Sequence, residues 1–152
     1  MEQNGRVLLH DEATGKAIGG FYSVFRELSG FPEHVLKRAL VIVFREAGLV
    51  VREEVPLPVM FRGRLLTTFR ADLIIDPGIV VEVKTAPEIA AYQKAQVLHY
   101  LKASNLEVGL LFNFGRRPQF ARIIYQSARN ESESPEPAQP DEGPSFGQSK
   151  ST

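Results

Sequence analysis

The 152-residue sequence contains no cysteine, carries no net charge and has no long apolar segment. The absence of cysteine excludes disulfide bonds and thiolate metal sites. The longest uninterrupted apolar run covers about six residues, Ala39 to Phe44, whereas a membrane helix needs roughly 20. The first residues mix charges of both signs before any apolar stretch, which does not match a secretory signal. These features predict a cytoplasmic protein that does not enter a membrane.

The balanced charge conceals an uneven distribution. From Gln126 onward the sequence is rich in Ser, Pro and Glu and almost free of apolar residues, which is typical of disorder. We therefore predict one domain over residues 1–125 and a disordered acidic tail over residues 126–152. The segment from Phe21 to Tyr125 holds 14 basic and 10 acidic residues, a net charge of +4. This excess is a weak indication of a polyanionic partner, and a neutral enzyme with an acidic tail explains it equally well.

Hydrophobic periodicity predicts helices first and strands afterwards. Apolar residues recur at helical spacing in two early segments, and alternation then indicates a three-strand meander, a helix and two more strands. The predicted helices cover residues 12–28, 32–48 and 88–103, and the predicted strands cover residues 50–61, 65–75, 79–84, 107–114 and 120–125. The order ααβββαββ predicts an α/β fold with a mixed central sheet flanked by helices.

Two of these strands, FRADLII and IVVEVK, contain charges although they read as central strands covered on both faces. If residues 76–78 form a three-residue hairpin loop, Ile75 pairs with Ile79 and Asp72 lies opposite Glu82. Two opposed carboxylates are destabilising unless a cation joins them. The register therefore predicts a cation at this position.

Lys84 follows Glu82 by two residues and should project from the same face of the strand. Two carboxylates and one ammonium group form the set that metal-assisted phosphodiester hydrolysis requires. The oxygen ligands suit Mg²⁺ or Mn²⁺, and the lysine could orient a water or stabilise charge on phosphorus. The alternative is an ordinary salt bridge between Lys84 and Glu82 or Asp72 at the end of the sheet. These three residues alone favour neither interpretation.

The helix after the third strand carries Gln96 and Tyr100, which are four residues apart and share one face, with Gln93 one turn earlier. A helix that connects parallel neighbours crosses back over the sheet, so this polar edge can overlook the strand end at Lys84. In isolation, a half-exposed polar helix face is the simpler interpretation.

A family resemblance rests on Glu33, Asp72, Glu82-Val83-Lys84 and Gln96-x-x-x-Tyr100 in this order. The set resembles the PD-(D/E)XK nuclease superfamily, particularly its branch with the QxxxY motif. More narrowly, the chain is similar to the GxxExxY proteins from about Leu8 to Tyr125. The resemblance implies a restriction-endonuclease-like αβββαβ core and metal-dependent hydrolysis of phosphodiester bonds. The implied partner is nucleic acid, DNA in preference to RNA.

The resemblance also implies a metal site for Mg²⁺ or Mn²⁺. Asp72 and Glu82 would be metal ligands, the backbone carbonyl of Val83 a third ligand, and Glu33 a helix acid that approaches the metal.

Beyond the metal, the resemblance implies that Lys84 is the catalytic lysine. Gln96 and Tyr100 would organise the site and contact the nucleic acid. One departure is visible: the namesake motif expects Tyr where this chain has Leu36, three residues after Glu33. An aliphatic side chain there can pack but cannot donate a hydrogen bond, so any polar role at that position is in doubt.

Other polar residues have simpler explanations. The arginines that could contact phosphates are Arg62, Arg64 and Arg70 around the long hairpin, and Arg116 and Arg117 in the last turn. Solvated turn charges explain them more simply. No histidine-containing ligand spacing occurs, so His34 and His99 are expected on the surface or in packing contacts.

Two classes of function remain after this comparison. The first is a metal-dependent nuclease, and the alternative is a catalytically inactive nucleic-acid-binding or regulatory module with the same fold. The predicted core is small for enclosing a duplex by itself, so a homodimer or a larger protein partner is also expected.

Overall fold

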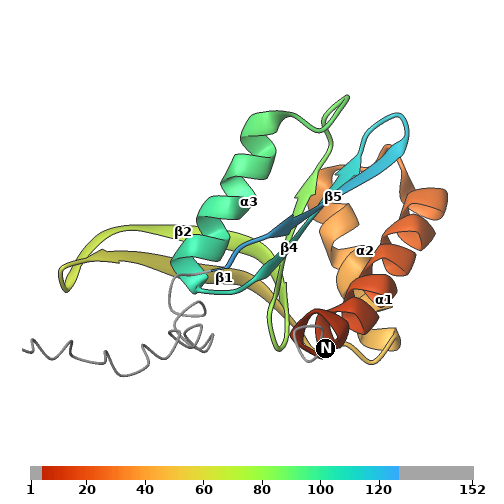
Figure 1. Cartoon of the computed structure of the whole chain (residues 1–152). Helices are drawn as coiled ribbons and strands as arrows, with labels where there is room; N and C mark the ends of the chain where they lie inside the picture. The colour runs from red at the N-terminus through yellow and green to blue at the C-terminus, as the bar shows by residue number, and fades with distance from the viewer. Residues whose placement is uncertain (1–4, 127–152) are drawn as a thin grey trace, which may run out of the picture.

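The computed structural model describes residues 5–126, with side chains from His10 onward (Figure 1). The predicted disordered tail lies outside the described residues, apart from Gln126. The elements are α1 (Gly5–Leu28), α2 (Glu33–Glu46), β1 (Val51–Phe61), β2 (Arg64–Ile75), β3 (Ile79–Lys84), α3 (Ala91–Ser104), β4 (Val108–Phe114) and β5 (Pro118–Ile124). Their order is the predicted ααβββαββ.

The five strands form one mixed sheet in the order β1-β2-β3-β4-β5. Only β3 and β4 run parallel, and α3 makes the crossover between them, as predicted. Helices α1 and α2 cover one face of the sheet and α3 covers the other (Figure 1). The predicted fold, an α/β restriction-endonuclease-like core with a mixed sheet flanked by helices, is confirmed.

Each face of the sheet has its own apolar core. On the α1–α2 face, Phe21 of α1 is fully buried and stacks on Phe112 of β4 with ring centroids 4.6 Å apart. On the α3 face, Leu101 packs with Val80 and Ile74 of the central strands. Burial of such side chains contributes roughly 1.5–3 kcal/mol each, which fixes the helices against the strands.

Some predicted boundaries are wrong. Helix α1 begins at Gly5 rather than residue 12, because its first turns lie outside the apolar repeat on which the prediction rested. Helix α3 begins at Ala91 rather than residue 88, because the Gln93 side chain accepts a hydrogen bond from the Ala90 backbone N–H and fixes the first turn there. Pro32 caps α2 from outside the helix instead of occupying its first turn.

Strands β1 and β2 form a long antiparallel hairpin that is irregular at two places. Glu53 pairs with Leu73 and Val55 with Ala71, while Glu54 between them has a φ of 48°. The register of the pairing shifts at Val59/Met60, and the hairpin beyond this point extends past the body of the molecule (Figure 1). No helix within residues 5–126 has both the length and the hydropathy of a transmembrane segment.

Candidate active site

Strands β2 and β3 separate next to the pair Leu73–Val81, and two carboxylates bridge the opening. The Asp72 backbone N–H donates to Glu82 Oε1 at 2.9 Å, and the Val83 N–H donates to Asp72 Oδ2 at 2.8 Å. Ile75 pairs with Ile79 as the loop length predicted, so the two acids occupy opposed positions. Each acidic side chain is therefore held by a backbone N–H of the opposite strand.

Lys84 ends β3 beside this pair. Its Nζ lies 4.0 Å from Glu82 Oε2, and its side chain is a quarter exposed. This separation is longer than a hydrogen bond. The ammonium group therefore faces the carboxylates and remains accessible from solvent, as a residue acting on a substrate must be.

The carboxylate pair has the electrostatics of a site that needs a cation. Glu82 is 3% exposed. Burial, followed by the negative charge of Asp72, raises the pKa of Glu82 to about 8, and Lys84 opposes this shift only in part. At neutral pH the metal-free carboxylate pair therefore retains a proton, which a bound divalent metal ion would displace.

The donor chemistry fits Mg²⁺ or Mn²⁺, which prefer hard oxygen ligands. Both carboxylates are fixed by backbone groups, so no side-chain rotation is needed to present their oxygens. Within the part of the chain that the structure describes, no three His, Asp or Glu side chains form a ready-made metal cluster. The pair Asp72–Glu82 is thus the acidic core of the site, and a ligand role for Glu33 stays a prediction.

Glu33 begins α2 and belongs to the same electrostatic environment. Burial, followed by the charge of Asp72, raises its pKa, while Lys84 and Lys37 act in the opposite direction. Glu33 therefore lies close enough to Asp72 and Lys84 for their charges to act on it, although α2 is far from β2 and β3 in sequence. Leu36, at the position where the namesake motif has Tyr, is fully buried in the α2 core. That position is therefore a packing position in this chain.

Lys37 joins the site without having been predicted. Its Nζ lies 3.3 Å from Asp72 Oδ1 and 2.7 Å from Glu54 Oε1. Burial alone would lower the pKa of Lys37, but the hydrogen bond to Glu54 and the charge of Asp72 raise it above its usual value. Lys37 follows Glu33 by four residues, so helical spacing could have identified it. Glu54 gave no such signal, because the left-handed backbone of β1 brings it there.

A cavity of about 210 Å³ opens beside this ion pair. It lies between α2 and the β1–β2 hairpin, and its lining includes the acids Asp72 and Glu54 and the bases Lys37 and Arg38. His34 also lines the cavity and is exposed, as expected for a surface histidine. This mixed lining can hold a charged group next to the carboxylate pair.

Helix α3 places Tyr100 beside the carboxylates. The Gln96 Nε2 donates to the Tyr100 hydroxyl at 2.9 Å, so the two residues share one face as predicted. Burial, followed by the charges of Glu82 and Asp72, raises the pKa of Tyr100. Because the amide donates, the Tyr100 O–H is free to donate toward the site. His99 stacks on Phe69, which is the expected packing role.

Asn113 is another residue that the sequence analysis missed. It is fully buried in β4, its Nδ2 donates to the Ala86 carbonyl at 2.9 Å, and its Oδ1 accepts from the Ala86 N–H at 2.9 Å. A Cβ added at Gly115 would lie 2.6 Å from the same carbonyl, so the contact requires glycine. Asn113 thus fixes the chain two residues after Lys84. An amide within the apolar strand VGLLFNF was the available signal.

The comparisons with known proteins agree with the fold of this chain. The chain matches the family model of the PD-(D/E)XK nuclease superfamily over residues 11–123. No curated protein matches it. The crystal structure of SSO0001 is similar, with a TM-score of 0.51 at 24% sequence identity, covering 64% of this chain and 52% of that one. This chain therefore spans about half the length of SSO0001, and the likeness shows the fold alone. The family match assigns the chain to the PD-(D/E)XK nuclease superfamily.

Proposed function

We propose that the protein is a divalent-metal-dependent nuclease that hydrolyses phosphodiester bonds in nucleic acid, DNA in preference to RNA. The observation that carries this proposal is the opposed pair Asp72 and Glu82, held by backbone N–H groups where β2 and β3 separate, with Lys84 beside it. Membership of the superfamily supports a hydrolase of this kind.

Asp72, Glu82 and the Val83 carbonyl would hold Mg²⁺ or Mn²⁺, with Glu33 approaching from α2. A bound ion of this type polarises a phosphate oxygen and lowers the pKa of a water molecule. The carboxylate of Asp72 accepts a hydrogen bond from the Val83 N–H, which fixes the β3 backbone at the residue that carries this carbonyl. The protein's contribution here is a rigid set of oxygen atoms.

Lys84 would orient the attacking water or stabilise the negative charge that develops on the phosphate oxygens. Tyr100 stays protonated at neutral pH because its pKa is raised, so its O–H can donate to a carboxylate or to a phosphate. Gln96 orients that hydroxyl through its own amide. Gln96 and Tyr100 therefore act as positioning and substrate-contacting residues.

Cleavage of labelled single- and double-stranded DNA and RNA by the purified protein tests the proposal. We expect cleavage in Mg²⁺ or Mn²⁺, none in EDTA, and at least about a 100-fold loss in Asp72→Asn and Lys84→Ala. Asn at position 72 keeps an oxygen for the Val83 N–H, and Lys16→Ala removes a lysine from α1 as a matched control. Undiminished cleavage in both site variants would contradict the assignment.

One observation favours the alternative, a catalytically inactive nucleic-acid-binding or regulatory module with the same fold. Lys37 already supplies Asp72 with a cation from within the chain. Salt-sensitive binding to nucleic acid without cleavage in any divalent metal would support this alternative.

The narrower assignments are also proposals. Membership of the GxxExxY proteins rests on the likeness from about Leu8 to Tyr125, in which Leu36 departs from the namesake motif. A cytoplasmic location, a homodimer or larger partner, and a domain that ends near residue 125 complete the proposed description.

A further inference from the structure

The outer part of the β1–β2 hairpin is a free-standing ribbon. We call residues 58–68 the arm. Every residue from Met60 to Thr68 is exposed, and the arm extends past the body of the molecule (Figure 1). Isolated two-stranded hairpins are marginally stable in water. The run of exposed residues from Met60 to Thr68 is therefore suited to binding a partner.

The tip of the arm presents large apolar side chains to solvent. Met60, Phe61, Leu65 and Leu66 are each more than half exposed. Met60 pairs with Leu65, so these two share one face of the ribbon, while Phe61 and Leu66 lie on the other. Each face of the tip therefore exposes two large apolar side chains, and exposed apolar surface of this kind marks interaction sites.

The charge of the arm indicates what kind of partner it fits. Between Val55 and Ala71 the charged residues are Arg62, Arg64 and Arg70, with no acid among them. A second copy of the chain would bring like charges together if two arms met, whereas a polyanion would neutralise them. Charge complementarity therefore favours nucleic acid over self-association.

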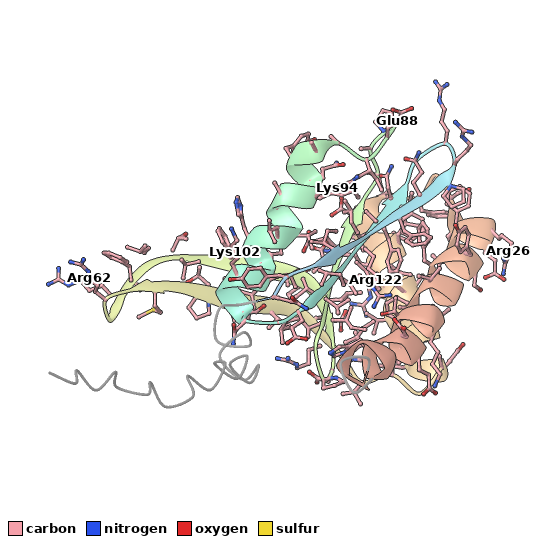
Figure 2. The ribbon with its side chains drawn as sticks, in the orientation of Figure 1. Arg26, Arg62, Glu88, Lys94, Lys102 and Arg122 are labelled. Carbon is pink, nitrogen blue, oxygen red and sulfur yellow. The ribbon has the colours of Figure 1, made fainter. Side chains whose placement is uncertain are left out.

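Arg62 and Phe61 form a composite surface at the tip. The Arg62 guanidinium lies over the Phe61 ring, 5.0 Å from its centroid, and Figure 2 shows Arg62 at the end of the arm farthest from the helices. A planar cation on an aromatic ring can contact a phosphate and a base in one place.

We propose that the arm holds the nucleic-acid duplex that flanks the cleaved bond. This inference rests on the proposed nuclease function, because β2 carries both the outer half of the arm and Asp72 of the carboxylate pair. From Gly63 to Asp72 the chain advances nine residues, which at ~3.3 Å per residue spans about 30 Å, or up to about nine base pairs. A two-stranded ribbon fits the major groove, and an apolar tip can insert between base steps.

Fluorescence anisotropy with labelled DNA duplexes in EDTA, from 50 to 200 mM salt, tests the arm without requiring cleavage. Arg62→Ala/Arg64→Ala should raise Kd at least about tenfold and reduce the salt slope by about two, since each phosphate contact contributes about 0.9. The control is Arg26→Ala, which removes an exposed arginine from α1 on the opposite side of the molecule (Figure 2). This variant should change Kd by no more than about twofold and should leave the salt slope close to that of the wild type.

The apolar tip gives an independent measurement. Phe61→Ala/Leu66→Ala should weaken binding at every salt concentration while leaving the salt slope unchanged. Affinity of the wild-type protein should also fall as the flanking duplex is shortened below about nine base pairs, and this length dependence should disappear in the arginine variant. Wild-type Kd, slope and length dependence in both arm variants would overturn the proposal.

Two further readouts separate this proposal from others. Cleavage of the same duplexes in Mg²⁺, together with unchanged binding by the arm variants, overturns the arm proposal and leaves the nuclease. Arm-dependent binding without cleavage in Mg²⁺ or Mn²⁺ supports the arm and overturns the nuclease. If sedimentation shows that Phe61→Ala/Leu66→Ala converts a dimer to a monomer while DNA binding is unchanged, the arm is a self-association contact and the proposal fails.

Discussion

Replacing Glu82 by Gln should stabilise the metal-free protein at alkaline pH. Folding raises the pKa of Glu82 from 4.5 to about 8. The folded protein therefore binds this proton more tightly than the unfolded chain does. The resulting stability is fully present below pH 4.5 and is lost as the pH rises through about 8. Gln is neutral throughout and can still accept the hydrogen bond from the Asp72 N–H, so Glu82→Gln avoids this loss.

The size of the effect follows from the two pKa values. A tenfold change in proton affinity is about 1.4 kcal/mol, so the change from 4.5 to about 8 sets an upper limit of about 5 kcal/mol. Relaxation of the strands and entry of water reduce this cost. We expect Glu82→Gln to exceed the wild type by at least about 2 kcal/mol in free energy of unfolding at pH 9, and to differ little near pH 4.5.

Urea denaturation in EDTA at pH 4.5, 6, 7.5 and 9 measures this difference. Glu88→Gln is the matched control, because Glu88 is exposed, and its curve should follow the wild type at every pH. Addition of Mg²⁺ at pH 9 should stabilise the wild type more than Glu82→Gln. Parallel curves for wild type and Glu82→Gln from pH 4.5 to 9 would refute a buried, proton-retaining carboxylate at position 82.

Three further perturbations test other parts of the site. Lys37→Met should tighten Mn²⁺ binding several-fold in a calorimetric titration, because Asp72 then loses its internal cation; unchanged or weaker binding would contradict this competition. Tyr100→Phe should lower kcat about tenfold with little change in melting temperature, and equal kcat in both proteins would exclude a role for the hydroxyl. Asn113→Ala should destabilise the protein by about 2–4 kcal/mol in urea denaturation, because it leaves the Ala86 N–H and carbonyl without partners. A cost below about 1 kcal/mol would show that the loop re-forms these hydrogen bonds elsewhere.

The central part of the site could be predicted because it depends on local rules. A three-residue loop fixes the pairing of Ile75 with Ile79, and simple counting then opposes Asp72 and Glu82. Helical spacing likewise brings Gln96 next to Tyr100. The alternation of apolar and polar residues gave the order of elements for the same reason, since it reflects which faces become buried.

The remainder of the site depends on departures from those rules. Glu54 reaches Lys37 because its backbone adopts a φ of 48°, which no pattern of residue types in β1 specifies. Asn113 bonds to Ala86 across 27 positions of sequence, so its partner is defined only by the parallel pairing of β3 and β4. Helix α3 starts later than predicted because the Gln93 side chain accepts a hydrogen bond from the Ala90 backbone N–H and so fixes the first turn there. Tertiary contacts decide the cases of Glu54 and Asn113, and a local side-chain hydrogen bond decides the start of α3.

Where β2 and β3 separate, carboxylate hydrogen bonds take the place of backbone hydrogen bonds between the strands. This arrangement limits which substitutions related sequences can accept at the two acidic positions. Asp72 and Glu82 hold the sheet together whatever their part in the proposed reaction, so a relative without that activity would still be selected to keep an oxygen acceptor at each position. The Lys84 ammonium group bonds no backbone atom within residues 5–126, and its loss would leave the strands paired. Among relatives, the lysine is therefore a more sensitive indicator of retained catalysis than either acid.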